Sequence, residues 1–413
     1  MTTPQTDILP NGLTVATEVV PGARSVGLAW HLPGGVARDP HHRIGLSAIH
    51  AELLLRGDHR LDSRAQADAF DTLGASRSSS VGTFGTSIGA TCLGARLADV
   101  LPLVVDMVRR PRMSPDDLEP ARDLCLQIID SLDDDPQERV SVNLRAAHAP
   151  EPINRTTLGT REGLRAVTAA ELAPAWAERA VPSGAILAIA GDVEHARILD
   201  MVAALTTGWT GAPIPIPSGT PGPRGYHHED DDTDQIHIAI AYDAPAETSA
   251  DAWFERMATA VLSGGMSGRL FSEIREKRSL CYSVHAGYAG DTTFGRTVAY
   301  AGTTPERAQE TLDLLLAELR RIRTDAGAVT VDELHRARVG MLSRLVFAGE
   351  STGARASAIA GDIRKIGRAR SMDDMVRRIE AVTLEHLNAY LRRTADLGRI
   401  TVATIGPSAL KMG

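Results

Sequence analysis

The 413-residue sequence contains only three cysteines, which are far apart and show no metal-type spacing: Cys92, Cys125 and Cys281. A sparse, odd-numbered set does not make a disulfide framework, so we expect a protein of the reducing cytoplasm. No run of about 18 uncharged apolar residues occurs, and the first residues lack a basic segment followed by an apolar one. We therefore expect neither a membrane span nor an export signal. The net charge of −8 disfavours nucleic acid and anionic membranes as partners.

The histidines are not arranged as metal ligands either. None of the 13 is followed by another histidine three or four residues later, and neither H-x-x-E-H nor H-E-x-x-H occurs. Such patterns place two imidazoles on one face of a helix, where they can share a zinc ion. His41, His42 and His59 flank a helical stretch, and His227-His228 precedes an acidic run. We interpret both groups as exposed or capping histidines, with a makeshift metal site as the alternative.

An internal repeat divides the chain. At this length we expect two domains of about 200 residues each. Leu164–Leu172 (LRAVTAAEL) leads into an apolar run and AGDV, and Ile379–Leu387 (IEAVTLEHL) leads into an apolar run and TIGP 215 residues later. Ser114–Arg122 and Thr330–Arg338 form another similar pair, 216 residues apart. A shared offset of this length indicates a duplicated domain.

The segment between the two copies is rich in proline and glycine. Residues 211–226 read GAPIPIPSGTPGPRGY, which predicts an extended linker between a domain at 1–210 and a domain at 227–413. Each half mixes strand-like runs such as Ala185–Ala190 with amphipathic helices such as Arg96–Arg109. This mixture favours an α+β fold with antiparallel-rich sheets and helices packed on one face.

Two segments resemble a known family. Gly45–Gly57, GLSAIHAELLLRG, is similar to the signature helix of the pitrilysin/insulinase metallopeptidases, which include the mitochondrial processing peptidases. Leu262–Val284, LSGGMSGRLFSEIREKRSLCYSV, is similar to the C-terminal motif of that family. The resemblance covers the whole chain and implies two homologous α/β-roll domains of the processing-peptidase (inverzincin) type, forming half of a clamshell.

The resemblance also implies a degenerate metal site. In the family, two histidines one helical turn apart and a distal glutamate bind zinc, and a glutamate beside the second histidine is the general base. With the helices in register, these positions carry Ala48, Ala51 and Glu52, and the distal position carries Ile128. Alanine and isoleucine can neither ligate a metal nor accept a proton. We therefore expect no metal in this chain and zinc in a partner.

The second half retains the family's arginine and tyrosine, at Arg275 and Tyr282. In the family this pair helps to hold the substrate and polarises the scissile carbonyl. The alternative interpretation is a surface arginine and an ordinary strand aromatic. Gly264 and Gly265 resemble a short form of the family's glycine-rich loop, so we expect them to contact substrate.

Together these features predict a non-catalytic subunit of a heterodimeric zinc endopeptidase. A sister chain bearing H-x-x-E-H would carry the zinc, and this chain would supply Arg275, Tyr282 and half of a chamber for a peptide, such as a leader peptide. Two alternatives remain open at this point. One is a structural or peptide-binding homologue with no part in hydrolysis, and the other is residual activity from an unorthodox metal site.

Overall fold

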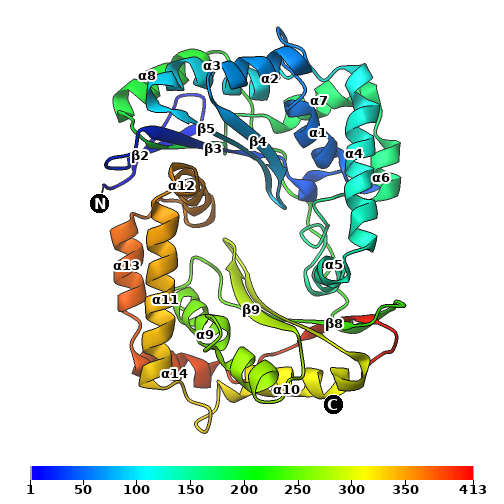
Figure 1. The fold of residues 1–413 in the computed structure, drawn as a ribbon. Coiled ribbons are helices and arrows are strands. Elements are labelled where there is room, and N and C mark those ends of the chain that lie inside the picture. The colour runs from blue at the N-terminus through cyan, green and yellow to red at the C-terminus, as the bar shows by residue number, and fades with distance from the viewer. Residues whose placement is uncertain (1, 413) are drawn as a thin grey trace. The chain divides into compact units, whose positions relative to one another are not determined.

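The computed structural model describes residues 2–412, which divide into two compact units (Figure 1). Unit 1 combines the chain up to residue 131 with residues 151–220 and 347–372. Unit 2 combines residues 132–150, 221–346 and the chain from 373 onward. The segment 211–226 contains one of these boundaries and has no helix or strand before Gly225. Each unit also takes one helix from the other half of the sequence.

Unit 1 is built on a six-stranded sheet in the order β1-β2-β6-β3-β5-β4. Strands β2 and β6 pair in parallel, and the other neighbours pair antiparallel. The strands are β1 (Gln5–Ile8), β2 (Thr14–Val19), β3 (Ser25–Pro33), β4 (Ser76–Val81), β5 (Gly85–Leu93) and β6 (Ile186–Gly191). The helices of this unit are α1 (Leu46–Leu54), α2 (Ser63–Thr72), α3 (Leu97–Arg109), α4 (Pro115–Asp133), α6 (Arg161–Ala166), α7 (Ala169–Arg179), α8 (His195–Leu205) and α12 (Thr352–Ile366).

Unit 2 is built on a five-stranded sheet in the order β7-β11-β8-β10-β9. Strands β7 and β11 pair in parallel, and the other neighbours pair antiparallel. The strands are β7 (Gly225–Asp230), β8 (Ile236–Ala244), β9 (Ser283–Gly290), β10 (Gly295–Thr303) and β11 (Thr401–Gly406). The helices are α5 (Pro136–His148), α9 (Ala252–Ser263), a π-helix (Phe271–Glu276), α10 (Ala308–Arg321), α11 (Val331–Gly349), α13 (Met372–Glu380) and α14 (Leu384–Arg393).

The two units repeat one design, as the sequence repeat predicts. Strands β6 and β11 lie 215 residues apart in sequence, and so do the starts of α7 and α14. Both helices begin at a threonine N-cap. Thr168 and Glu171 form a capping box, and the Thr383 side chain accepts a hydrogen bond from the backbone N–H of His386. The strand orders also agree, with β1 as an additional edge strand in unit 1. The expected α+β class and the homology of the two halves are confirmed.

Both faces of each sheet are covered, whereas the sequence predicts helices on one face. The larger core of unit 1 lies between the sheet and most of its helices, around Trp30 and Leu101. The opposite face packs against α12 through small and branched residues, including Ala188 and Ile359. In unit 2 the corresponding second face packs against α5, in a buried cluster that includes Leu144 and Tyr300. One helix therefore covers the second face of each sheet.

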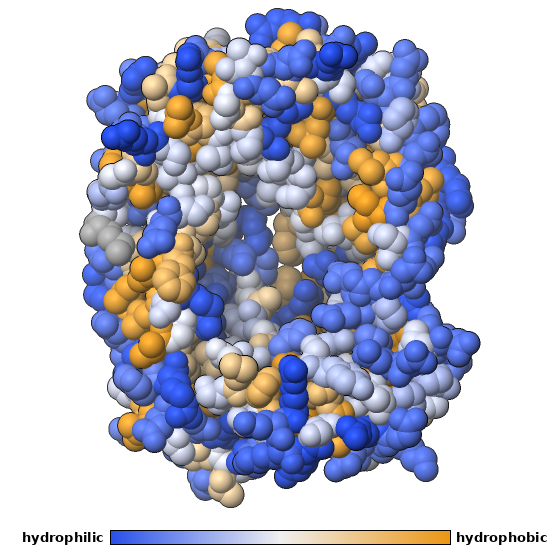
Figure 2. All heavy atoms as spheres, in the orientation of Figure 1, coloured by the Kyte–Doolittle hydropathy of each residue, from blue (hydrophilic) through white to orange (hydrophobic). Residues whose placement is uncertain are grey.

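The surface is mixed in character. On the face shown in Figure 2, hydrophobic residues form separate patches among hydrophilic ones, and one patch lies over α11. Exposed Val339 and Val346 belong to this helix. Among residues 2–412, no helix combines the length and the apolar composition that a membrane crossing requires.

Candidate functional site

Helix α1, which resembles a zinc-binding helix, starts at a buried carboxylate. Asp39 accepts hydrogen bonds from the backbone N–H of Gly45 (2.9 Å) and from the Ser47 hydroxyl (2.6 Å). Arg179 donates to the same carboxylate at 2.7 Å and to the Ser47 hydroxyl at 2.6 Å. Gly45 has a φ of 127°, a conformation that disfavours a side chain, and a Cβ there would meet Leu164. This network fixes where α1 begins and therefore which residues face outward.

The family's ligand positions on α1 and α4 carry no zinc-binding set. Ala51 is buried, and Ala48 and Glu52 are half-buried. On α4, Ile128 is 40% exposed and presents an aliphatic side chain. Within the described chain, the Glu52 carboxylate forms no hydrogen bond and no ion pair. One carboxylate beside two methyl groups and an isoleucine does not fit zinc, which needs several nitrogen, sulfur or oxygen donors.

A cysteine that the sequence reasoning did not select lies close to Glu52. Cys125, on α4, is 4% exposed and is within electrostatic range of the Glu52 carboxylate. Burial and this negative charge raise the pKa of Cys125 to about 12. The thiol therefore stays protonated and is a poor metal ligand. Among residues 2–412, no three histidine, cysteine or acidic side chains come together in an arrangement that could hold a metal ion.

The histidines near α1 have structural positions. His50 is fully buried, its Nε2 lies 3.0 Å from the Leu172 carbonyl oxygen, and its ring packs edge-on against Trp176. Burial and the nearby Arg179 lower the pKa of His50 to about 3, so the ring is neutral. His41, His42 and His59 are exposed, as the sequence predicts.

His227 and His228 are half-buried on β7, whereas the sequence predicts exposed or capping side chains. The Nδ1 atom of His228 lies 2.9 Å from the Thr404 hydroxyl on the neighbouring strand β11. The Nε2 atom of His227 lies 3.2 Å from the Arg224 carbonyl oxygen. Both imidazoles therefore belong to the packing of the sheet.

Strand β4 lies against α1 at the edge of the six-stranded sheet. Its sequence, SRSSSV, alternates exposed with half-buried residues. It pairs with β5 on one side, so its other edge is the last of the sheet. An unpaired strand edge offers backbone donors and acceptors to an added strand. The surface beside the degenerate metal positions is thus suited to an extended peptide.

Arg275 and Tyr282 are exposed donors in unit 2. Arg275 lies on the π-helix, a rare conformation that is frequent at functional sites, with its guanidinium 5.0 Å from the centre of the Phe271 ring. Tyr282 is 62% exposed and directly precedes β9, with its backbone N–H bonded to the Gly302 carbonyl. Neither side chain forms a hydrogen bond or ion pair with another described residue. Arg275 is within electrostatic range of Cys281, which directly precedes Tyr282 in the sequence.

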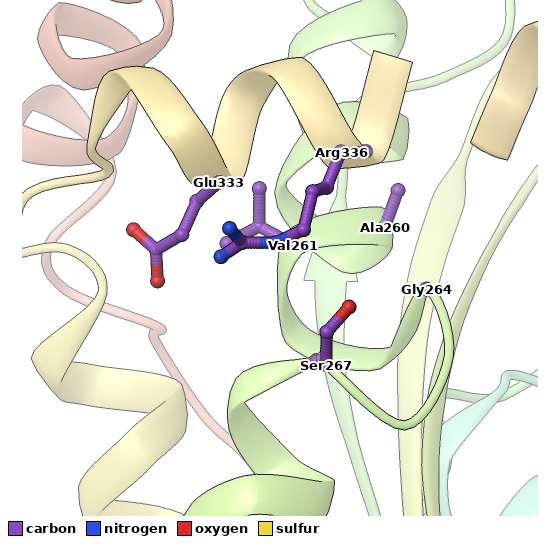
Figure 3. Close-up of a pocket in the computed structure, with 8 residues that line it drawn as sticks. Ala260, Val261, Gly264, Ser267, Glu333 and Arg336 are labelled. Atoms are coloured by element: carbon purple, nitrogen blue, oxygen red, sulfur yellow. The ribbon is translucent and has the colours of Figure 1, made fainter. Parts of the chain in front are cut away.

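Gly264 and Gly265 lie in the exposed turn between α9 and the π-helix. Figure 3 shows Gly264 and Ser267 on this turn beneath α11, from which Arg336 extends toward Val261. The enclosed space is about 20 Å³, which is room for a single water molecule. Arg269 anchors the end of the turn to Glu333 (Nε–Oε1 2.6 Å). The turn is well placed to hold the π-helix, and its cavity is too small for a peptide side chain.

A larger groove in unit 2 has no counterpart in the sequence reasoning. Its volume is about 540 Å³, and α9, β9, α11 and α13 form its walls. Arg256 stacks over Trp253 and Tyr288 at 5.0 and 5.1 Å, and Met341 and Ile379 add apolar surface. The groove borders β9, the edge strand of its sheet. Four separate segments contribute to it, so no local sequence pattern could have indicated it.

The chain is similar to a described protein family and to several curated relatives. A family model described as "Peptidase M16 inactive domain" matches residues 166–341. The matched segment contains Arg275 and Tyr282 and excludes α1 and α4. An uncharacterized zinc protease of Mycobacterium tuberculosis is 27% identical over 99% of this chain and 94% of its own length. An uncharacterized zinc protease of Streptomyces coelicolor is 29% identical over 97% of this chain and 88% of its own length.

Solved structures share the fold over nearly the whole chain. A peptidase M16 inactive domain from Pseudomonas fluorescens has a TM-score of 0.88 at 19% identity and covers 99% of both chains. A protease from Helicobacter pylori has a TM-score of 0.87 at 16% identity, covering 98% of this chain and 100% of its own. A chain of complex III from Candida albicans has a TM-score of 0.83 at 18% identity, covering 98% and 96%.

Proposed function

Because the chain belongs to the M16 peptidase family, we propose that it is the non-catalytic subunit of a two-chain zinc endopeptidase. A sister chain bearing H-x-x-E-H would carry the zinc. The proposal is supported by a difference between the positions that bind zinc in the family and the positions of its arginine and tyrosine. Ala48, Ala51 and Ile128 provide no ligands, whereas Arg275 and Tyr282 are both present and exposed.

The chemistry of Arg275 and Tyr282 suits stabilisation of a developing oxyanion. Zinc bound in the sister chain would supply an activated water as the nucleophile for the peptide carbonyl. A guanidinium and a phenol can donate hydrogen bonds to the oxygen on which negative charge then develops. Such donors contribute about 10²–10³ in rate each when they are preorganised. Both side chains are free of competing hydrogen bonds within residues 2–412, so neither must break a hydrogen bond to act.

Peptide binding has support from the sheet edges. Strands β4 and β9 each leave one edge of their sheet unpaired, and an extended chain can add to such an edge through backbone hydrogen bonds. The groove beside β9 could accept apolar side chains. We propose unfolded peptide segments, such as leader peptides, as substrates. The three cysteines are free and buried, which fits our proposal of a cytoplasmic location.

The direct test combines the purified chain with an H-x-x-E-H sister chain from the same genome. Arg275→Ala and Tyr282→Phe should each lower kcat/KM of the pair by about 10²–10³ while leaving the melting temperature unchanged. Arg320→Ala, a change at an exposed arginine on α10, is the matched control and should retain full turnover. Unchanged turnover in both test variants would contradict the assisting role.

A second candidate is a structural or peptide-binding homologue with no part in hydrolysis. The fold likeness to a chain of complex III from Candida albicans favours it, because the fold also occurs in a protein described as part of such an assembly. This candidate predicts a stable complex with another chain, and peptide binding without turnover. Hydrolysis that depends on Arg275 would exclude it.

A further inference from the structure

One face of the second sheet carries an excess of positive charge. Arg296 lies on β10, directly across from Asp243 of β8 in the antiparallel register. Helix α5 packs on this face of the sheet and contributes Arg145 and His148. Arg224 approaches from the start of β7. Asp243 faces Arg296 and binds Arg224, and Glu138 of α5 is within electrostatic range of Arg145.

Asp243 is already engaged. Arg224 donates to both of its carboxylate oxygens, at 2.6 and 2.8 Å, and His148 Nε2 lies 3.3 Å from Oδ1. Burial alone would raise the pKa of Asp243, but the hydrogen bonds and charge of Arg224, with His148, lower it. His148 is itself neutral at physiological pH, because burial and the nearby Arg224 lower its pKa to about 4. Asp243 is therefore occupied by Arg224, and it forms no hydrogen bond with Arg296.

Arg296 has no compensating contact. Its side chain is half-buried, and within residues 2–412 it forms no hydrogen bond and no ion pair. Burial and the neighbouring guanidinium of Arg145 lower the pKa of Arg296. Arginine is rarely removed from water unless it is paired, because its desolvation is unfavourable. A half-buried guanidinium that has no bonded carboxylate, with a second guanidinium within electrostatic range, is an arrangement that an anion would complete.

We propose that Arg296, with Arg145 beside it, is a subsite for a carboxylate of a bound peptide. This inference rests on the proposed function as a peptide-binding subunit, and it adds a specificity for acidic groups. The planar guanidinium of Arg296 can bind both oxygens of a carboxylate in a bidentate manner. A peptide can supply this carboxylate from its C-terminus or from an aspartate or glutamate side chain. The net charge of −8 disfavours nucleic-acid phosphates as the ligand.

Small carboxylates test the subsite on the full chain without a known substrate. The probes are N-acetylglutamine, which has the α-carboxylate, and N-acetylisoglutamine, which has the side-chain carboxylate. N-acetylglutamine amide, which has neither, is the blank. At about 50 mM and constant ionic strength, at least one acid should raise the melting temperature by about 1–2 °C. The acid that succeeds identifies the source of the carboxylate.

Three variants decide the outcome. Arg296→Gln should lose the ligand-induced rise, Arg296→Lys should keep part of it, and the exposed control Arg320→Gln should keep all of it. Without ligand, Arg296→Gln should melt no lower than the wild type, because the substitution removes an uncompensated positive charge. An equal rise in wild type and Arg296→Gln, or no rise with either acid, would overturn the proposal.

A peptide assay separates this proposal from the proposed function. A labelled, unfolded peptide is prepared with glutamate or glutamine and with a free or amidated C-terminus. The acid forms should bind the wild type about 10–100-fold more tightly than the uncharged form, and Arg296→Gln should abolish the difference. If the sister pair cleaves peptides through Arg275 but shows no acid preference, the subsite fails alone. If the acid preference depends on Arg296 but Arg275→Ala cleaves normally, the assisting role fails alone.

Discussion

Arg355 of α12 donates a hydrogen bond to Glu18 of β2 at 2.8 Å, across 337 residues of sequence. Both side chains are only 4% exposed, so this ion pair lies inside unit 1. It fixes a helix from the second half of the sequence on the sheet formed by the first half. Burial raises the pKa of Glu18, and the charge and hydrogen bond of Arg355 oppose that rise. The carboxylate therefore depends on its partner to stay ionised.

We predict that Arg355→Met destabilises unit 1 by about 3–5 kcal/mol, because it leaves a buried carboxylate without a counter-ion. Urea unfolding followed by tryptophan fluorescence measures this, since Trp30, Trp176 and Trp209 all belong to unit 1. Adding Glu18→Gln to the variant should recover part of the loss. A variant as stable as the wild type would show that α12 is held by its apolar contacts alone.

Gly27 on β3 provides a second test of how α12 packs. A Cβ at this position would overlap the backbone of Gly353 in α12, because strand and helix are in direct contact. Gly27→Ala should therefore lower the free energy of unfolding by about 1–3 kcal/mol through overpacking. Gly361→Ala is the matched control, since a Cβ there has open space and alanine favours the helix. Limited proteolysis should cut the α12 region faster in Gly27→Ala and not in the control.

The sequence predicts the repeated order of helices and strands better than it predicts which helix packs on which sheet. The 215-residue offset anticipates that β6 and β11 are equivalent, and the threonine caps at Thr168 and Thr383 are local patterns with a direct structural meaning. The exchange of α5 and α12 is different. Both helices have ordinary amphipathic sequences, and the contact of Arg355 with Glu18 links segments at opposite ends of the chain. No local pattern specifies which sheet such a helix will cover.

Some residues of the candidate sites can be selected from the sequence, and others cannot. The residues Ala48, Ala51 and Ile128 can be selected from motif spacing, because a helix converts spacing into a common face. The half-buried Arg296 cannot be selected in this way. It lacks a bonded carboxylate because Asp243 binds Arg224, which lies on another segment. Tyr282 lies one residue before β9, with a backbone hydrogen bond that extends the strand pairing.

His50 makes stability depend on pH. Its pKa is about 3 in the folded chain and about 6.5 when unfolded, so between these values the unfolded state binds more protons. The contribution of His50 is complete above pH 6.5 and declines as the pH falls. Lowering the pH from about 7.5 to 5.5 should reduce the free energy of unfolding by about 1.4 kcal/mol through this residue. His50→Gln should flatten the dependence by that amount, and the exposed control His335→Gln should not. Identical slopes in wild type and His50→Gln would show that the ring titrates normally.

The assignment of degenerate ligand positions can be tested by restoring them. If α1 and α4 are aligned as the family resemblance implies, Ala48→His, Ala51→Glu, Glu52→His and Ile128→Glu together should create a zinc site. The two new histidines would lie at i and i+4 on one helical face, and the new carboxylate on α4 would be the third ligand. The control carries the three α1 substitutions and keeps Ile128. Elemental analysis after dialysis against zinc and removal of the excess should find about one zinc per chain in the four-fold variant and substantially less in the wild type and the control. Stoichiometric zinc in the wild type would instead favour an unorthodox metal site. A folded four-fold variant that binds no more zinc than the control would mean that position 128 is not the distal ligand position.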